Sequence, residues 1–409
     1  MLSWARQFNI FCFLDNQQYA DESHQYECLL AAGQVDYFSS TDLNGLDDFL
    51  NTNPSWIFGH LSYELKNALH HFTTIKTTRI GFPEVYFFIP RLIIILRSNV
   101  ISIYADDPRS VYEAITKTEA FVPGPILAPQ IEQSLTKEEY IDTVRMLQDH
   151  ILKGDCYEIN FCQEFYAESC TLDPFSVYQK LMEVSPNPFS AFYRLNDKYL
   201  LCASPERFLQ KSGNKLLSQP IKGTIKRNLS NEEKDQALLE ELKASQKDQS
   251  ENVMVVDLVR NDLSRICEKN SVRVDELFGI YSFPQVHQMI STISGVLQPK
   301  VSFSQILQAC FPMGSMTGAP KHKVMQLIDT YENQSRGIFS GSIGYFNPQG
   351  DFDFNVVIRS IMYNSTEKYL SYQVGSGITY YSDPEKEWEE CLLKAAAIET
   401  VLSSIESHE

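Results

Sequence analysis

The chain has 409 residues, and 43% of them are apolar, which is enough to fill the core of one large α/β unit or of two to three domains. Its formal net charge of -17 argues against a nucleic-acid-binding protein, because such proteins cluster lysine and arginine on one face. Its nine cysteines include no Cys-x-x-Cys pair, so we expect neither a disulfide framework nor a zinc site, and a reducing cytoplasm fits this usage.

Nothing in the sequence predicts export or membrane insertion. Residues 1–16 lack a basic region followed by an apolar run, and the apolar stretch at 92–96 is far too short to cross a bilayer. We therefore expect a cytoplasmic protein without membrane contact.

The first 130 or so residues are predicted to form mainly strands and turns. Pro123, Gly124, Pro125 and Pro129 then indicate a linker, because proline fixes φ and removes a hydrogen-bond donor. We place a boundary near residue 133, between an N-terminal region (1–133) and a core (134–409). The apolar runs that predict the early strands lie at 56–63, 85–89 and 92–104.

The second part of the chain carries clearer helix signals. Thr136 and Glu139 form a capping box before an apolar stripe that stops at Gly154. The Asp-Pro pair at 173–174 begins another helix, and a long polar helix that starts near Asn231 becomes apolar at 253–259. Further helices are predicted at 303–310, 319–331 and 385–405, and strands at 341–346, 352–361 and 370–375.

Lys222 stands directly before Gly223, at the end of a short apolar strand predicted at 215–221. This order places an amine on a tight turn, where backbone can approach a ligand. Glu206 follows the neighbouring predicted strand, and its carboxyl beside Phe208 is a candidate general acid with a raised pKa. The alternatives are a surface lysine and a salt bridge from Glu206 to Arg207.

Two acidic pairs occur at the i,i+3 spacing that places both carboxylates on one helix face: Asp248 with Glu251, and Glu387 with Glu390. Mg²⁺ prefers oxygen ligands and usually takes one or two carboxylates together with substrate oxygens. Two such helices facing each other would therefore make a site for a carboxylate-bearing substrate. The alternative is a pair of solvated acidic faces.

Several other features could bind an anion. The loop at 311–321 leads into a helix whose first turn has unpaired N–H groups, although it lacks the ending of a Walker loop. Gly375 and Gly377 follow a strand, Arg359 ends an apolar strand and could clamp a carboxylate, and His287 could hydrogen-bond a substrate. A structural loop, a tight turn, an internal ion pair and a structural histidine are the respective alternatives.

The motifs described above, in their order along the chain, resemble those of the chorismate-utilising enzymes. This family includes anthranilate synthase component I, aminodeoxychorismate synthase component I and the isochorismate and salicylate synthases. The resemblance runs from about Gly154 to Leu402, and in the N-terminal third it is confined chiefly to 59–65. The motifs that carry it lie at 154–161, 204–208, 220–224, 251–263, 311–321, 375–378 and 382–390.

The resemblance implies an α+β fold of two intertwined subdomains, with antiparallel sheets packed centrally and helices outside. Within the family, the residue before Gly-Thr is alanine in anthranilate synthases and typically lysine in aminodeoxychorismate synthases, so Lys222 resembles the latter. That branch makes 4-amino-4-deoxychorismate from chorismate and ammonia, as the first step toward p-aminobenzoate and folate.

The resemblance also implies roles for single residues. Lys222 resembles a nucleophile that attacks C2 of chorismate, and Glu206 resembles the acid that protonates the departing C4 hydroxyl. A lysine nucleophile must be deprotonated, and Lys226 and Arg227 are candidate cations that would lower its pKa. Glu251 and Glu390 resemble Mg²⁺ ligands, supported by Asp248 and Glu387. The implied substrate contacts are Thr224, His287, Thr317, Tyr345, Arg359, Gly375 and Gly377.

The implied partner is a separate glutamine amidotransferase subunit that supplies ammonia, because no segment has a nucleophilic cysteine in a Gly-x-Cys-x-Gly turn. Related enzymes often hold tryptophan through a Leu-Leu-x-Ser segment and an Asn-Pro segment. The nearest stretches here are 29–32 and 187–191, and the first lacks the serine. The alternative functions are an anthranilate synthase component I and a non-catalytic subunit that binds chorismate or a partner.

Overall fold

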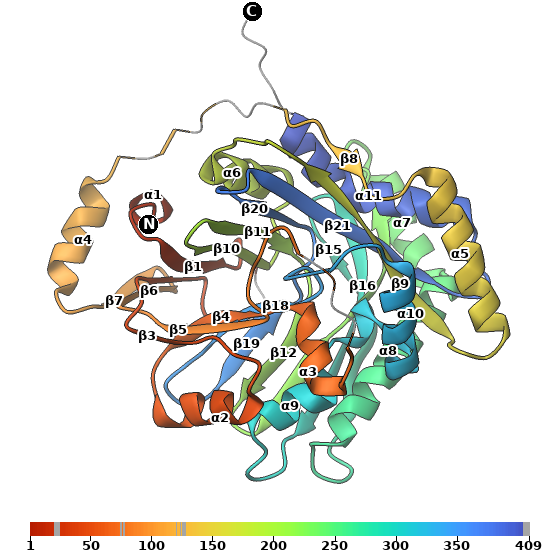
Figure 1. Ribbon diagram of the computed structural model, residues 1–409, viewed down its shortest axis with the longest axis horizontal. Coiled ribbons are helices and arrows are strands. Elements are labelled where there is room, and N and C mark those ends of the chain that lie inside the picture. The colour runs from red at the N-terminus through yellow and green to blue at the C-terminus, as the bar shows by residue number, and fades with distance from the viewer. Residues whose placement is uncertain are drawn as a thin grey trace, which may run out of the picture.

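Two antiparallel sheets form the centre of the molecule, and helices cover their outer faces (Figure 1). The computed structural model describes residues 1–19, 25–73, 76, 78–119, 121, 122, 124 and 128–403. Within these residues, sheet A has 11 strands and sheet B has 10. This arrangement confirms the predicted α+β fold with central packed sheets.

Sheet A contains the strands at both ends of the chain. Its order is β17 (Gly318–Ala319), β9 (Glu158–Ala167), β21 (Tyr369–Ile378), β20 (Ser360–Asn364), β11 (Lys198–Ser204), β10 (Phe189–Leu195), β1 (Ile10–Asp15), β2 (Cys28–Ala32), β6 (Leu92–Arg97) and β7 (Val100–Tyr104). The short β8 (Glu132–Gln133) pairs with β9 outside this order.

Sheet B is also built from distant segments. Its order is β14 (Ile221–Lys226), β16 (Val286–Val296), β13 (Lys215–Gln219), β12 (Arg207–Ser212), β19 (Phe352–Asn355), β18 (Ser342–Phe346), β4 (Ile57–Leu61), β5 (Val85–Ile89) and β3 (Asp36–Phe38). β15 (Arg273–Ser282) pairs with β16.

The helices divide between the two sheets. α5, α6, α10 and α11 contact strands of sheet A, and α7 and α8 contact strands of sheet B, so the sheets lie between helical layers (Figure 1). The bounds are α1 (Leu2–Ala5), α2 (Leu43–Thr52), α3 (Lys66–His70), α4 (Pro108–Lys117), α5 (Lys137–Leu152), α6 (Pro174–Val184), α7 (Glu232–Ala244), α8 (Gln246–Ser264), α9 (Phe303–Cys310), α10 (Lys321–Tyr331) and α11 (Pro384–Ser403), with 3-10 turns at Tyr63–Leu65 and Gly314–Met316.

Alternation along the strands explains why sheet A can separate two cores. In β2, Leu29 and Ala31 pack in the cluster shared with sheet B, whereas Leu30 points to the opposite face. There it joins a second cluster with Tyr140 of α5 and Trp388 of α11. Successive side chains of a strand point to opposite faces, so β2 is apolar on both.

Local signals placed several elements correctly. The capping box of Thr136 and Glu139 starts α5, and Asp173 caps α6 through the N–H of Ser176. The helix predicted at 303–310 is α9. These signals succeed because a cap is satisfied by residues within one turn of the chain.

Two predicted elements are divided in the structure. The helix predicted from Asn231 is two helices, because Ser245 ends α7 and its hydroxyl accepts from the N–H of Asp248 to begin α8. The strand predicted at 352–361 ends at Asn355 in sheet B and resumes at Ser360 in sheet A. Arg359 lies in this crossover with φ of 53°, a left-handed conformation that interrupts a strand.

The predicted cut near residue 133 does not divide the sheets. Residues 1–133 supply β1, β2, β6, β7 and β8 to sheet A and β3, β4 and β5 to sheet B, together with four α-helices in the described part of that range. Of the predicted linker, Pro123 and Pro125 lie outside the described residues, as do the last two positions of the helix predicted at 385–405.

No helix in the described ranges combines the length and the apolar character needed to cross a lipid bilayer. All nine cysteines have free thiols and are buried.

Candidate active site

A pocket opens where the edge of sheet B meets sheet A, beneath α8 and α11. It holds about 860 Å³ of space, including the part open to solvent. Of the predicted site residues, it brings together Glu206, Lys222, Thr224, Asp248, Glu251, Arg359, Gly375, Gly377 and Glu390. The other lining residues are Asn160, Pro205, Ile221, Gly223, Gln288, Ser315, Met316, Phe339, Ile358, Gln373, Val374 and Lys394.

Lys222 reaches the pocket from a bulge in β14, and not from a tight turn between strands as predicted. The register of β14 against β16 shifts between Ile221 and Thr224, and Gly223 within the bulge has φ of 94°. A Cβ on Gly223 would also lie 3.0 Å from Cβ of Asp248. Glycine is therefore needed here for its backbone conformation and for the close approach of α8.

The ammonium group of Lys222 forms an ion pair with Oε1 of Glu158, on β9 of the opposite sheet. Burial lowers the pKa of Lys222, but Glu158 and then Glu251 and Glu390 raise it, and the net result is a raised pKa. The prediction that neighbouring cations lower this pKa is therefore wrong. Arg227 instead pairs with Asp235 at 2.6 Å, and neither it nor Lys226 lines the pocket.

Glu206 lies in the turn between β11 and β12, and only 4% of it is exposed. Its Oε1 accepts a hydrogen bond from the hydroxyl of Ser315 at 2.5 Å. Burial raises the pKa of Glu206 to about 7, which the bond from Ser315 and the charge of Lys222 only partly offset. Arg207 pairs with Asp353 at 2.9 Å, so the alternative salt bridge to Glu206 is absent between these described residues.

The two acidic helices converge at the mouth of the pocket. α8 contributes Asp248 and Glu251, and α11 contributes Glu390. Lys394 pairs with Glu390 at 2.7 Å and lowers the pKa of this carboxyl to about 2, whereas burial raises that of Glu251 to about 7. The pKa values of the two carboxyls therefore differ because Glu390 has a hydrogen-bonded lysine at 2.7 Å, whereas for Glu251 burial outweighs the charges of Lys222 and Lys247.

Glu387 lies behind this surface and is 1% exposed. The ammonium group of Lys247 lies 3.2 Å from Oε1 of Glu387 and 3.7 Å from Oε1 of Glu251, so one lysine links the two helices. This place agrees with a supporting role for Glu387 and not with direct contact to a substrate.

Some carboxylate oxygens of α8 and α11 have no partner in the described part of the chain. Oε1 of Glu251 and Oε2 of Glu387 are buried and accept no hydrogen bond there. Among the described residues, no group of three or more acidic, histidine or cysteine side chains could hold a metal by itself. Two protein carboxylates are enough for Mg²⁺ when substrate and water oxygens complete its shell, so Glu251 and Glu390 could serve as ligands, with Lys394 competing for Glu390.

Two cations face these carboxylates. Arg359 projects from the crossover between the sheets, and its Nη1 donates to the carbonyl of Lys394 at 2.9 Å. Lys394 in turn donates to the carbonyl of Gly375 at 2.8 Å. A Cβ on Gly375 would lie 2.5 Å from the carbonyl oxygen of Phe161, so this glycine lets β21 and β9 pair closely at the pocket.

Two predicted substrate contacts lie outside the pocket. His287 is buried, with Nδ1 2.8 Å from the hydroxyl of Ser282 and Nε2 3.2 Å from Asp235. The hydroxyl of Thr317 donates to the carbonyl of Met313. His287 precedes the lining residue Gln288 in β16, where successive side chains point to opposite faces, and Thr317 follows the 3-10 turn that ends at the lining residue Met316.

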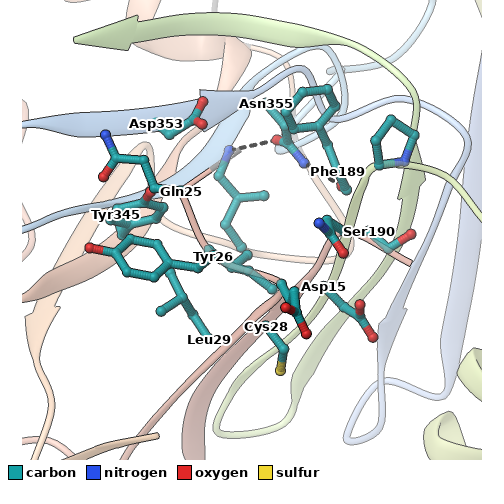
Figure 2. A pocket seen from close by; sticks show the side chains of 15 residues that line it. Asp15, Gln25, Tyr26, Cys28, Leu29, Phe189, Ser190, Tyr345, Asp353 and Asn355 are labelled. Carbon is teal, nitrogen blue, oxygen red and sulfur yellow. Dashed lines mark hydrogen bonds between the residues drawn. The ribbon is translucent and has the colours of Figure 1, made fainter. Parts of the chain in front are cut away.

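Tyr345 is the third predicted contact that lies elsewhere. It lines a second pocket between the sheets, where it and Tyr26 stand opposite Phe189 and Asn355 (Figure 2). Asn355 is held there by hydrogen bonds to the N–H of Ile343 and the carbonyl of Phe189. Both stretches considered for tryptophan binding contribute to this second pocket.

Sequence reasoning missed several lining residues, and it missed Glu158 behind them. Glu158 and Asn160 are two residues apart and so share one face of β9, a strand that is otherwise mostly apolar. Polar residues in such a strand were the available sequence signal of a functional site. Lining residues such as Gln288 and Gln373 had no comparable signal, because isolated amides in strands are ordinary. The missed polar residues are Glu158, Asn160, Gln288, Ser315, Gln373 and Lys394.

The family described as chorismate binding enzyme matches residues 10–400 of the chain. The chain belongs to the chorismate binding enzyme family. The match covers both sheets and every residue that lines the pocket.

Two relatives within the chorismate binding enzymes illustrate the likeness. The chain is 34% identical to aminodeoxychorismate synthase component 1 of Klebsiella aerogenes, over 85% of the chain and 77% of that protein. It is 43% identical to the chloroplastic aminodeoxychorismate synthase of Arabidopsis thaliana over 64% of the chain, but it spans only 28% of that protein's length.

The fold is shared more widely. The crystal structure of anthranilate synthase component I from Streptococcus pneumoniae superposes with a TM-score of 0.80 over 94% of this chain and 93% of that one, at 24% identity. This likeness concerns the fold alone.

Proposed function

We propose that the chain converts chorismate and ammonia to 4-amino-4-deoxychorismate, the precursor of p-aminobenzoate in folate synthesis. The observation that carries the proposal is Lys222, an amine that lines the pocket with only 11% of its side chain exposed, together with the acid Glu206 in the same lining. The relatives named aminodeoxychorismate synthase support the assignment.

In the first chemical step, Lys222 attacks C2 of chorismate. A C2–N bond forms, the two ring double bonds shift, and the C4–O bond breaks. Glu206 donates the proton that turns the departing hydroxyl into water, and its raised pKa keeps part of this carboxyl protonated near neutral pH. The product of this step is a covalent adduct on Lys222.

Ammonia resolves the adduct in the second step. A C4–N bond forms, the double bonds return to their original places, and the C2–N bond to Lys222 breaks. The new C4 ammonium gives a proton to the Glu206 carboxylate, which restores the acid for the next turnover. The net reaction is chorismate plus ammonia to aminodeoxychorismate plus water.

Chorismate is a dianion, whereas the chain has a net charge of -17, so the pocket needs local positive charge. Arg359 and Lys394 supply two such charges on the wall. Glu251 and Glu390 would hold Mg²⁺, which when bound supplies positive charge for the ring carboxylate. Lys222 would then act at C2, beside the ring carbon that carries this carboxylate, and Glu206 would act at C4 across the ring.

The product assay decides between the possible functions. We expect p-aminobenzoate when the protein is incubated with chorismate, Mg²⁺ and an ammonium salt and the reaction is completed with aminodeoxychorismate lyase. Anthranilate as the product would instead make the chain an anthranilate synthase component. No turnover and no adduct would favour a non-catalytic subunit.

The adduct provides a test of Lys222 itself. Intact-mass spectrometry of the wild type with chorismate and no ammonia should show a covalent adduct, and Lys222→Ala should show none. Lys226→Ala is the matched control, because this lysine lies on the same strand outside the pocket and should leave the adduct unchanged. The same adduct on Lys222→Ala would refute the nucleophile assignment.

The partner and the compartment are part of the proposal. Ammonia would come from glutamine through a separate amidotransferase subunit, in keeping with the component 1 names of the bacterial relatives. Nine free buried cysteines suit a reducing cytoplasm. A glutamine-dependent rate that appears only when an amidotransferase subunit is added would support this arrangement.

A further inference from the structure

We propose that Glu158 is the proton acceptor for Lys222: it takes a proton from the ammonium group before the attack on C2 and returns it when the lysine leaves. This inference rests on the proposed function, because it concerns the same lysine. It assigns a role to a carboxylate that the sequence analysis did not select.

Glu158 meets Lys222 across the gap between the sheets. It begins β9 in sheet A, it is 1% exposed, and its Oε1 contacts Nζ of Lys222 on β14 of sheet B. Gly377 on β21 completes the arrangement, since a Cβ there would lie 2.7 Å from Nζ and 2.9 Å from Oε1. The backbone therefore leaves room for this one contact.

The second oxygen of Glu158 has no partner among the described residues. Oε2 is buried and accepts no hydrogen bond from them, and the side chain is held through Oε1 by Lys222. Transfer of one proton from Lys222 converts the ion pair into a neutral amine and a neutral carboxyl without moving net charge into the buried site.

The other charged groups around Lys222 are unsuited to accept its proton. Glu206 must be protonated to donate to the hydroxyl, so it cannot accept a proton in the same step. The carboxylates at the mouth would be occupied by Mg²⁺, and the two cations cannot accept. These groups are Asp248 and Glu251 on α8, Glu390 and Lys394 on α11, and Arg359 in the crossover.

The proton balance closes over the cycle. An N–H bond of Lys222 breaks and an O–H bond of Glu158 forms, which leaves the neutral amine that attacks C2. When ammonia bonds to C4, the lysine departs as a neutral amine. Glu158 then returns its proton, and the original ion pair is restored. No oxidation or reduction takes place, and no further reactant is needed.

Glu158→Gln tests the inference, because it preserves the shape of the side chain and removes the acceptor. At pH 6.5 we expect adduct formation to be about 100-fold slower than in the wild type, within the usual range for loss of a general base. The ratio of the wild-type rate to the Glu158→Gln rate should fall about tenfold per pH unit as the pH rises, because in the variant the proton of Lys222 must leave to water. A constant ratio of the two rates from pH 6.5 to 8.5, or equal rates, would overturn the proposal.

Two further variants guard against a folding defect. Glu164→Gln on the same strand is the matched control, because this buried glutamate lies outside the pocket and should leave the rate unchanged. Glu158→Asp retains a carboxylate, so we expect a slower reaction with the pH profile of the wild type. A Glu158→Asp profile identical to that of Glu158→Gln would contradict the acceptor role.

Chemical labelling separates this inference from the proposed function. Acetic anhydride acetylates only the neutral amine, and peptide mass mapping gives the pH at which half of Lys222 reacts without any chorismate. Glu158→Gln should lower this midpoint by at least about one pH unit, since the nearest anion is lost. An unchanged midpoint overturns the role of Glu158, whereas an absent wild-type adduct overturns the proposed function alone.

Discussion

Glu206 is the residue whose protonation should set the upper pH limit of the reaction. Its pKa is raised to about 7 by burial, and it can donate a proton only below that value. The rate of adduct formation from chorismate, measured without ammonia, should therefore be high below pH 7 and fall about tenfold per pH unit above it. A wild-type rate that increases from pH 7 to 9 would contradict the acid role.

The stability of the folded state should depend on the protonation of the same carboxyl, and in the same direction as the rate. Because the folded pKa of Glu206 is above its unfolded value, protonation favours folding below pH 7, and this contribution is lost as the pH rises through 7. Glu206→Gln therefore serves as the control: its slow reaction should lack the decline above pH 7, and its unfolding midpoint at pH 8 should be no lower than that of the wild type.

Gly377 allows the contact between Lys222 and Glu158, and we expect Gly377→Ala to damage function more than folding. The added Cβ would lie 2.7 Å from Nζ, the flexible end of a lysine, which can shift without disturbing the backbone. Adduct formation should fall at least about 100-fold, as reacting groups are misplaced by about an ångström. The melting temperature should change by only a few degrees.

Gly124→Ala is the control for that experiment, because a Cβ on Gly124 meets nothing within 4 Å. It should leave both the rate and the melting temperature unchanged. A Gly377→Ala variant with the wild-type rate would show that the close approach at Gly377 has no bearing on the chemistry.

At the scale of elements, α8 and α11 would together support the proposed metal. Glu251→Gln and Glu390→Gln should each raise the Mg²⁺ concentration for half-maximal rate by at least about tenfold, because each removes one charged ligand. Both proteins should melt near the wild-type temperature, since a glutamine can occupy either place. EDTA should abolish turnover of the wild type.

Glu389→Gln provides the matched control, because Glu389 is adjacent to Glu390 on α11 but is exposed. Its Mg²⁺ dependence should equal that of the wild type. If the Glu390→Gln protein also showed the Mg²⁺ dependence of the wild type, a ligand role for Glu390 would be ruled out.

Elements set by local contacts could be predicted from the sequence, and those set by distant partners could not. The cap of α5 needs only Thr136 and Glu139, so a short window of sequence contains the cause. The break after Asn355 has no local cause that a window could show, since both halves are apolar and only the pairing of β19 with β12 and of β20 with β11 separates them.

The same distinction applies to the site. Lys222, Glu206 and the acidic pairs were selected from motifs, and the pocket contains most of them. Tyr345 was assigned by resemblance and lies in the second pocket, because a family motif identifies a position in the chain and not the direction of its side chain. Glu158 could not be matched to Lys222, because the two are 64 residues apart and on different sheets.

For the whole molecule, residues 1–133 are part of both sheets. Without them, β10 of sheet A loses its partner β1, and β18 of sheet B loses its partner β4. Exposed central strands pair with other chains, so we expect a fragment of residues 134–409 to aggregate when it is expressed alone. A soluble monomer with a cooperative melting transition, observed by light scattering and circular dichroism, would contradict this.

The contact between Lys222 and Glu158 joins one sheet to the other, and this has a consequence for how the molecule acquires activity. Each sheet can gain its hydrogen bonds before the two are docked, but neither contains a complete pair of reacting groups. After dilution from denaturant, far-ultraviolet ellipticity should therefore return before the ability to form the adduct does. The recovery of adduct formation would therefore report when the last step of assembly, the alignment of one sheet on the other, is complete.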